Sequence, residues 1–240
     1  DMFDVAGCIT GAGNPDFKAS HLPAQNTAPV IRQLIAAGGT LIGKSLTDEL
    51  ALSLDGINVH YGTPINSQFP DRIPGGSSSG SVAAVAAGVA DFGIGTDTLG
   101  SIRVPSAYCG IYGFRPSHGS VDTSGVIPLG PSFDTVAWCA RTAGLMAQIG
   151  AALLPAATTK AKTNPSWRAC LLENCFALIP DVQLRSSLLI AAGKMLELHG
   201  IQTQTIHLPD GLLDQCLDIF NKIRGWEAWN AHGKWITETA

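Results

Sequence analysis

Two loops rich in glycine and serine, separated by a short apolar stretch, constrain the fold of this chain more than any other feature. Residues 75–80 read GGSSSG and residues 95–105 read GTDTLGSIRVP. Between them, residues 81–87 are almost all alanine and valine, which predicts a short and tightly packed helix. Residues 90–95 then predict a strand that leads into the second loop. The pattern indicates an α/β fold in which polar loops adjoin closely packed elements.

The rest of the chain alternates helix and strand signals, with glycine and proline marking their ends. The segment from about residue 55 to 80 is rich in proline, glycine and serine, which predicts a long loop of the kind that usually has a function. The second half is expected to run strand, helix, strand, helix. The expected helices are residues 29–37, 136–154, 181–199 and 210 onward with a break at Gly225, and the expected further strands are residues 40–43, 169–179 and 201–207.

The composition favours one well-packed domain that acts on a small molecule. Of the 240 residues, 45% are hydrophobic and 14% are charged, so we expect residues 1–240 to form a single, partial domain with a sizeable core. A net charge of −4 provides no basic field for nucleic acid or anionic lipid, and neither is an expected partner. Because the chain has no apolar run of membrane-spanning length and no leader-like start, we expect a cytoplasmic location.

Cysteine and histidine spacing argues against a metal or redox site. The six cysteines stand singly in apolar contexts, without the paired spacing of a zinc or redox motif, and we expect them to be reduced core residues. No two histidines have the i, i+4 separation that would place two ligands on one helix face. We therefore expect neither a metal nor a cofactor.

The first loop has three alternative interpretations. Because residues 75–80 precede a predicted helix, their backbone N–H groups are free to point into a cleft and their hydroxyls can bond a developing charge. A flexible turn that merely caps the helix is the second alternative. A phosphate-binding loop is the third, but these residues lack the Gly-Lys-Ser/Thr ending of a P-loop. Gly43-Lys44-Ser45 resembles that ending, and a nucleotide site there is not favoured.

The second loop places a serine just after a strand and a turn. That position exposes a nucleophile while consecutive backbone N–H groups can line an oxyanion pocket, which is the arrangement that acyl transfer requires. Ser101 is therefore the candidate nucleophile. A Ser-His-Asp mechanism is disfavoured because no Gly-x-Ser-x-Gly motif surrounds Ser101 and no histidine is singled out by its context.

Taken together, the two loops resemble the amidase-signature family, with Ser77 and Ser101 lying 24 residues apart. The resemblance covers residues 1 to about 154 and extends to other motifs of that family. These motifs are Gly43-Lys44-Ser45 with Asp48-Glu49, residues 108–116, Gly119-Ser120-Val121, residues 125–129 and residues 133–136. The expected fold is accordingly the α/β amidase-signature fold, a mixed central sheet flanked by helices.

The resemblance also implies a Ser-Ser-Lys mechanism. Ser101 matches the serine that attacks the amide carbonyl, and Ser77 matches the serine that relays the proton and follows a cis peptide bond. By the same resemblance, the N–H groups of Thr98, Leu99, Gly100 and Ser101 form the oxyanion hole. Three further residues have supporting roles, and Gly75 and Gly76 belong to the substrate-binding loop. The supporting residues are Asp97 and Arg103, expected to be an ion pair that braces the loop, and Ser78, which either bonds the nucleophile loop or only caps the following helix.

The chain departs from the family pattern at its ends. The lysine of the triad is expected just before Asp1, so we expect a truncation at both ends and no activity of residues 1–240 alone. Lys44 matches a different lysine of the family and is not assigned as the base. Leu99 and Ser79 stand where the family usually has a small residue and a glycine. Apolar substitutions like Leu99 occur in the branch of plant-type amidase 1 and its catalytically silent relatives in organelle import receptors, and the chain resembles this plant-type amidase 1 and indole-3-acetamide hydrolase-like branch.

Three functions are compatible with these residues. The favoured one is an amide hydrolase that cleaves a small-molecule carboxylic amide to acid and ammonia through a seryl acyl-enzyme. The alternatives are a catalytically silent, amidase-like interaction or receptor module and a subunit resembling glutamyl-tRNA amidotransferase A. A homodimer is one option for its assembly.

Overall fold

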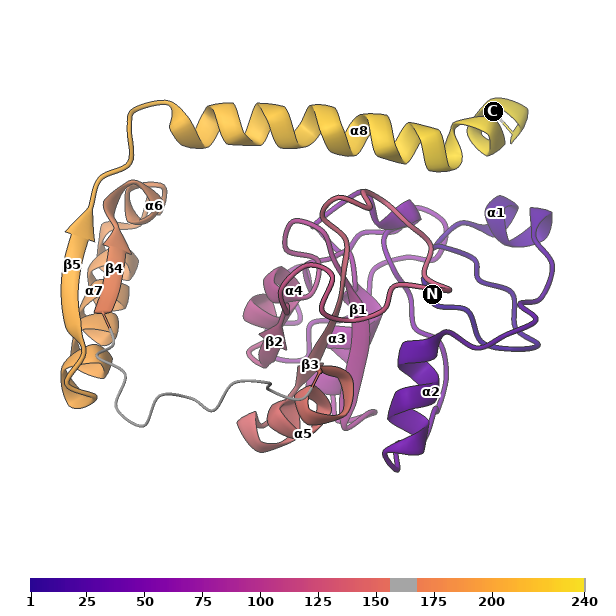
Figure 1. The fold of residues 1–240 in the computed structure, drawn as a ribbon, viewed down its shortest axis with the longest axis horizontal. Helices are drawn as coiled ribbons and strands as arrows, with labels where there is room; N and C mark the ends of the chain where they lie inside the picture. The colour runs from indigo at the N-terminus through magenta and orange to yellow at the C-terminus, as the bar shows by residue number, and fades with distance from the viewer. Residues whose placement is uncertain (156–167, 240) are drawn as a thin grey trace. The chain divides into compact units, whose positions relative to one another are not determined.

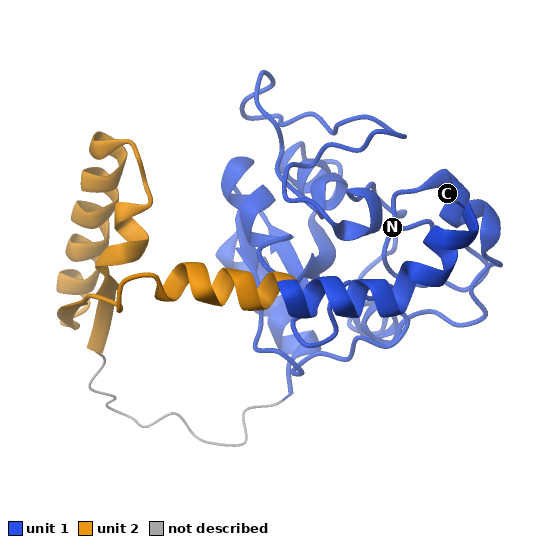
Figure 2. Cartoon of the chain, turned by 90° about the horizontal axis from the view of Figure 1, so that it is seen from above, with its two compact units in different colours: residues 1–156, 222–240 blue, residues 157–221 orange. Residues whose placement is uncertain are grey.

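The computed structural model describes residues 1–155 and 168–239, which form two compact units (Figures 1 and 2). The first unit contains residues 1–156 and 222–240, and the second contains residues 157–221. The last helix begins in the second unit and ends in the first. The single-domain assignment stays a prediction.

The first unit combines short helices with a three-stranded antiparallel sheet in the order β1-β3-β2. Its strands pair so that Thr96 lies opposite Val136 and Phe114 opposite Trp138. The elements are α1 (Pro15–Ser20), α2 (Pro29–Ala36), a 3-10 helix (Glu49–Ala51), α3 (Ser79–Ala86), β1 (Phe92–Asp97), α4 (Arg103–Tyr108), β2 (Tyr112–Phe114), β3 (Thr135–Ala140) and α5 (Ala143–Leu153).

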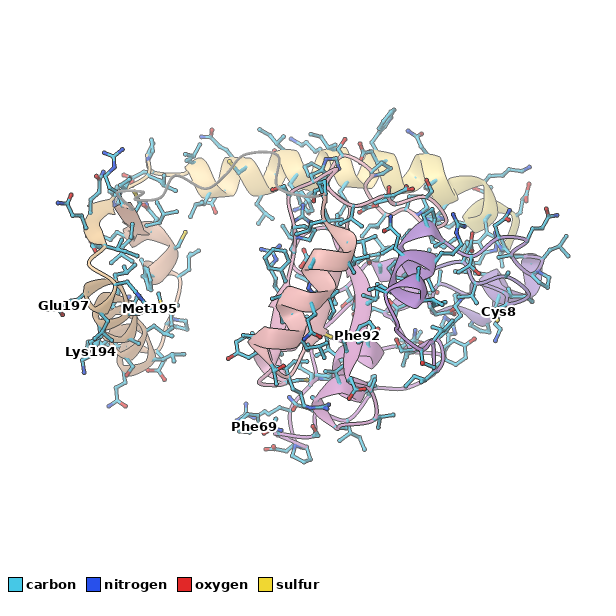
Figure 3. All side chains as sticks on the ribbon, turned by 60° about the horizontal axis from the view of Figure 1, so that its bottom comes forward. Cys8, Phe69, Phe92, Lys194, Met195 and Glu197 are labelled. Atoms are coloured by element: carbon cyan, nitrogen blue, oxygen red, sulfur yellow. The ribbon has the colours of Figure 1, made fainter. Side chains whose placement is uncertain are left out.

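The second unit contains a parallel pair of strands, β4 and β5. Its elements are β4 (Arg168–Leu172), α6 (Glu173–Ala177), α7 (Val182–Leu198), β5 (Gln202–Ile206) and the start of α8 (Leu212–Thr239). Asp181 caps α7, where its carboxylate accepts hydrogen bonds from the N–H groups of Gln183 and Leu184. Many apolar side chains of α7 are exposed, among them Met195 (Figure 3). Among the described residues, no helix is both long and apolar enough to cross a membrane.

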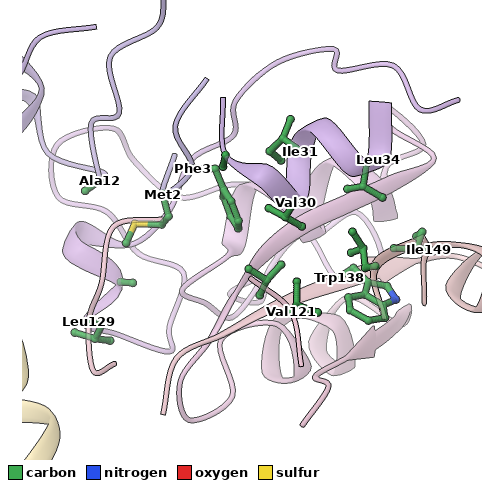
Figure 4. Close-up of a cluster of buried hydrophobic side chains, with 14 of the residues drawn as sticks. Met2, Phe3, Ala12, Val30, Ile31, Leu34, Val121, Leu129, Trp138 and Ile149 are labelled. Carbon is green, nitrogen blue, oxygen red and sulfur yellow. The ribbon is translucent and has the colours of Figure 1, made fainter. Parts of the chain in front are cut away.

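The main core of the first unit lies between α2, the sheet and α5. Figure 4 shows Val30 and Leu34 of α2 in the same cluster as Trp138 of β3 and Ile149 of α5. Trp138 is the largest fully buried side chain among the described residues. Its ring contacts Phe114, and its indole N–H donates to the carbonyl oxygen of Met146. This cluster fixes β3 and therefore the strand beside it, β1, which leads into the second serine loop.

Several expected elements are confirmed, and four differ from the structure. The α2, α3, β1, α7 and β5 segments lie where the sequence places them, within a few residues. Residues 40–43 form no strand: Leu41 and Ile42 are exposed, and no strand pairs with them in the described part. The expected helix 136–154 is instead β3 followed by α5, because Val136 and Trp138 favour a strand and Thr142 caps a new helix.

The other differences lie in the second half of the chain. The expected strand 169–179 ends at Leu172, where α6 begins, and α8 continues through Gly225 without a break. The cysteines are free, but only Cys109 and Cys139 are buried as expected; burial raises the pKa of the Cys139 thiol to about 12. The four remaining cysteines are exposed, contrary to expectation: Cys8, Cys170, Cys175 and Cys216.

Glycine at position 95 allows α3 to lie against β1. A Cβ atom built on Gly95 would lie 2.3 Å from the hydroxyl oxygen of Ser78, at the start of α3. Gly95→Ala should therefore push the two elements apart and lower the free energy of unfolding by about 1–3 kcal/mol, as overpacking of a core does. Urea denaturation followed by fluorescence measures this change.

The matched control is Gly144→Ala in the first turn of α5, where an added methyl group has no neighbour within 4 Å. This variant should be neutral or more stable by up to about 1 kcal/mol, because alanine is the better helix former. Equal urea midpoints for Gly95→Ala and Gly144→Ala would contradict the close packing described here.

Candidate active site

Hydrogen bonds of its own backbone groups hold the turn that carries Ser77 against neighbouring segments. The carbonyl oxygen of Ser77 accepts hydrogen bonds from the N–H of Asp48 (3.0 Å) and the hydroxyl of Thr47 (2.9 Å), and the N–H of Gly76 donates to the carbonyl oxygen of Leu54 (2.8 Å). The peptide bond between Gly76 and Ser77 is cis. Ser77 is fully buried, and its hydroxyl has no hydrogen-bond partner among the described residues.

Glycine is required at the two positions before Ser77. Gly75 has a φ of +74°, which disfavours other residues, and a Cβ there would lie 2.9 Å from the Cα of Pro105. A Cβ on Gly76 would lie 2.3 Å from the Oδ2 atom of Asp48. The segment containing Asp48 and the start of α4 thus close tightly around the turn.

Ser78 joins the two serine loops. Its N–H donates to the carbonyl oxygen of Ser101 (3.1 Å). Its hydroxyl lies 3.2 Å from both the N–H and the carbonyl oxygen of Thr96, accepting from the first and donating to the second. Ser78 stands at the start of α3 but makes no side-chain capping bond there. Ser78 thus contacts both Thr96 and Ser101, and its supporting role stays a prediction.

Asp97 and Arg103 form the expected ion pair within the second loop. The carboxylate of Asp97 is completely buried and accepts from the Nε of Arg103 at 3.0 Å and from its Nη2 at 2.9 Å. It also accepts, at 3.3 Å, from the backbone N–H groups of Ile102 and Arg103 at the start of α4. These hydrogen bonds raise the pKa of Arg103, so the guanidinium stays charged.

Two residues without an assigned role in the sequence argument also hold this loop. Arg115 donates to the carbonyl oxygens of Asp97, Thr98 and Phe133. Asp134 accepts from the Thr98 hydroxyl at 2.6 Å, and its second oxygen accepts from backbone N–H groups of residues 129 and 130. The signal in the sequence is the charged residue that stands inside each of the motifs 108–116 and 133–136.

The backbone N–H groups that follow Asp97 have no hydrogen-bond acceptors among the described residues. Within the described part of the chain, no hydrogen bond is made by the N–H groups of residues 98–101. Ser101 is buried, while the Leu99 side chain is 45% exposed. Buried N–H groups are nearly always paired, so a row of free donors beside a serine can accept a negatively charged oxygen.

The structure brings Ser77 and Ser101 into neighbouring loops, but the relay contact between their hydroxyls is not formed, because the Ser77 hydroxyl has no partner. Lys44 is bound elsewhere. Its ammonium pairs with the Asp1 carboxylate at 2.9 Å and donates to the carbonyl oxygen of Ile9 and the hydroxyl of Thr10. Burial lowers the pKa of Lys44. The roles of the two serines stay predictions.

Neither a nucleotide cradle nor a metal cluster is evident in the described residues. Residues 38–45 read GGTLIGKS, which has P-loop spacing. However, the residues after Ser45 are irregular up to the 3-10 helix at Glu49, so the helix N-terminus that would receive a phosphate is missing there. Within the part described, no group of three or more His, Cys, Asp and Glu side chains could hold a metal ion.

Comparison with known proteins identifies the family. The family model described as Amidase matches residues 1–170. The chain is 56% identical over 154 residues to Amidase 1 of Arabidopsis thaliana, covering 64% of this chain and 36% of that protein. It is 47% identical over 192 residues to Amidase 1 of Oryza sativa subsp. japonica, covering 80% and 44%. The chain therefore spans less than half the length of these relatives.

A solved structure described as an amidase matches with a TM-score of 0.85 and 29% identity, covering 99% of this chain and 53% of the other. The predicted α/β amidase-signature fold is confirmed by this likeness, as is the predicted branch near plant amidase 1.

The expected cytoplasmic location is wrong. The chain is 42% identical over 181 residues to Outer envelope protein 64, chloroplastic, of Arabidopsis thaliana, covering 75% of this chain and 30% of that protein. A composition that lacks a membrane-spanning run could not distinguish a cytoplasmic protein from a relative of an organelle envelope protein. The glycine and serine loops, their geometry and the match over residues 1–170 agree, and the chain belongs to the amidase signature family.

Proposed function

We propose that this chain is the serine-bearing part of an amide hydrolase, which cleaves a small carboxylic amide to acid and ammonia through an acyl-enzyme on Ser101. The observation that supports this most is the row of unpaired N–H groups at residues 98–101, in a loop hydrogen-bonded to the Ser77 turn. Because the chain spans 36% and 44% of the two amidase relatives, the activity is proposed for the whole protein.

The reaction transfers the acyl group in two steps. The Ser101 hydroxyl oxygen attacks the amide carbonyl carbon while its proton passes through the Ser77 hydroxyl to a base. The oxygen of the tetrahedral intermediate becomes negative and accepts from the free N–H groups of residues 98–101. When the C–N bond breaks, the leaving nitrogen takes the proton and departs as ammonia. Water then attacks the ester by the same route, releasing the acid and regenerating Ser101.

The base comes from the family resemblance. We assign it to the lysine of the family's triad and not to Lys44, whose ammonium is bound to Asp1, Ile9 and Thr10.

A catalytically silent interaction module is the second candidate. The observation that favours it is the likeness to outer envelope proteins, one of which is described as a translocon component of the chloroplast outer membrane of Pisum sativum. Such a module would keep the fold without forming an acyl-enzyme.

Labelling with a fluorophosphonate separates the two candidates. Protein expressed from the complete coding sequence should be labelled at Ser101, and Ser101→Ala should abolish labelling because the attacking oxygen is gone. Ser77→Ala should slow it by at least about a hundredfold, which is the usual contribution of a proton-transfer group.

The control is Ser117→Ala, which removes an exposed serine hydroxyl and should leave the labelling rate unchanged. Absence of labelling in the folded, unmutated protein would favour the silent module. Labelling that persists in Ser101→Ala would show that another residue is the nucleophile.

The bracing of the nucleophile loop gives a second prediction. Asp97→Asn keeps the shape of the side chain but leaves Arg103 and Arg115 without their counter-ion. We expect the free energy of unfolding to fall by about 2–3 kcal/mol. This loss is smaller than the loss on breaking a fully buried ion pair, because the Arg103 side chain is 49% exposed.

Urea denaturation measures that loss, with Asp71→Asn as the matched control. Asp71 pairs with Arg72 at 3.9 Å, but both side chains are about four-fifths exposed, so its removal should cost less than about 0.5 kcal/mol. Similar losses for the two variants would contradict a bracing role of Asp97.

A further inference from the structure

The C-terminal half of α8 contacts the loop of residues 128–133, which leads into β3. Residues 222–240 belong to the first unit, so these contacts lie within one unit (Figure 2). At one end of the loop, the Nε2 atom of the buried His232 lies 2.7 Å from the carbonyl oxygen of Pro128. Because a carbonyl oxygen can only accept, this ring nitrogen carries a hydrogen and donates it.

Glu227 of the same helix binds the other end of this loop. One oxygen of its carboxylate accepts from the backbone N–H of Ser132 at 3.1 Å, and the second accepts from the Ser132 hydroxyl. Gly130 lies between the two contact points, and a Cβ atom there would lie 3.4 Å from Glu227 Oε2. The helix therefore holds the loop closely on both sides of Gly130.

The loop that α8 holds is also the loop that orients Asp134. The Oδ2 atom of Asp134 accepts from the N–H groups of Leu129 at 2.8 Å and Gly130 at 3.0 Å, both inside the held segment. Its Oδ1 atom accepts from the Thr98 hydroxyl at 2.6 Å. Thr98 begins the row of N–H groups that make no hydrogen bond within the described part of the chain. A chain of contacts thus runs from α8 through Asp134 to the start of this row.

Apolar and aromatic contacts also attach this part of α8 to the first unit. The Trp235 ring lies 5.1 Å from the ring of Phe17, and Ala228 packs against the main core. Such contacts stabilise without fixing an exact distance, whereas hydrogen bonds are directional and add little net stability. A displacement of about 1 Å in a reacting group can slow a reaction about a hundredfold. The polar contacts of α8 should therefore affect the geometry of the site more than the stability of the fold.

We propose that Glu227 and His232 are positioning residues for the anion-binding backbone, and that they act on Thr98 through the loop 128–133 and Asp134. The inference rests on the proposed function, since it concerns the N–H groups that would accept the negative oxygen. In this role neither residue contacts the substrate or transfers a proton. The two residues keep the donors in place before the charge develops, so the backbone need not reorganise in the transition state.

Saturation kinetics of fluorophosphonate labelling, in protein expressed from the complete coding sequence, test this role. The plateau rate reports the chemical step at Ser101, and the half-saturating concentration reports binding of the probe. Glu227→Ala removes both contacts to Ser132. We expect the plateau rate to fall about tenfold. The half-saturating concentration should change by less than about twofold, because the lost contacts act on the transition state.

Two further variants distinguish positioning from a general loss of structure. Glu227→Gln keeps the length of the side chain and an acceptor oxygen, so its plateau rate should lie within about twofold of the unmutated protein. Thr98→Val removes the hydroxyl that binds Asp134 but keeps the backbone N–H. In the Thr98→Val background, Glu227→Ala should slow labelling by less than about twofold, because the connection is already broken.

His232→Phe tests the other end of the loop independently. The variant keeps a ring at the position that contacts Phe17 but loses the donor to Pro128. The plateau rate should fall by at least about threefold, again without a matching change in the half-saturating concentration. If Glu227→Ala fails to fold, as thermal unfolding would report, His232→Phe takes its place in the comparison with Thr98→Val.

Glu238→Ala is the matched control. Glu238 lies on the same helix, but its side chain is 65% exposed and pairs with Lys234 at 3.9 Å. Its removal should leave both the plateau rate and the half-saturating concentration unchanged.

Three results would overturn the inference while leaving the proposed function intact. The first is an unchanged plateau rate in Glu227→Ala, and the second is a plateau rate in Glu227→Gln as low as that in Glu227→Ala. The third is an equal loss from Glu227→Ala with and without the Thr98 hydroxyl. If the unmutated protein is not labelled at any probe concentration, the proposed function fails and this inference fails with it.

Discussion

The carboxylate of Asp97 is the interaction on which the candidate site depends most. It is fully buried at the end of β1 and receives the Arg103 guanidinium and two N–H groups at the start of α4. The carbonyl oxygen of the same residue accepts from Arg115 and from the Thr135 hydroxyl of β3. A buried charge is tolerated only when several donors surround it, and here those donors come from both sides of the nucleophile loop. Satisfying one carboxylate therefore fixes the path of the backbone that presents Ser101.

The two serine loops are positioned by their backbones, which leaves their side chains available. Carbonyl oxygens of Ser77 and Ser101 accept hydrogen bonds from neighbouring segments, while the Ser77 hydroxyl has no partner in the described part of the chain. The Ser78 hydroxyl, by contrast, is fully used in holding Thr96. Two consecutive serines therefore differ: the Ser78 hydroxyl is bonded within the fold, and the Ser77 hydroxyl is free of partners among the described residues. It also accounts for the glycines at 75 and 76, since any side chain there would collide with the segments that hold the turn.

Local patterns predicted the parts of the site that lie close together in sequence. The glycine and serine loops, α3 and β1 follow from composition and periodicity within about thirty residues. Asp48, Arg115 and Asp134 could not be assigned in this way, because each acts on a loop far from it along the chain. The same limit explains the missing strand at residues 40–43, since an apolar run becomes a strand only beside a partner. The error at residues 136–154 arose because an apolar run does not by itself distinguish a buried strand from a helix.

The pairing of β3 with β1 affects how easily the nucleophile loop can unfold locally. The Thr135 hydroxyl donates to the carbonyl oxygen of Asp97, and Asp134 accepts from the Thr98 hydroxyl, so the first residues of the nucleophile loop are tied to the start of β3. Local fluctuations that would loosen an ordinary surface loop must here also separate two strands of the central sheet. Amide hydrogen exchange at Thr98 should then require the same cooperative opening as this end of the sheet, although its N–H makes no hydrogen bond to the described residues.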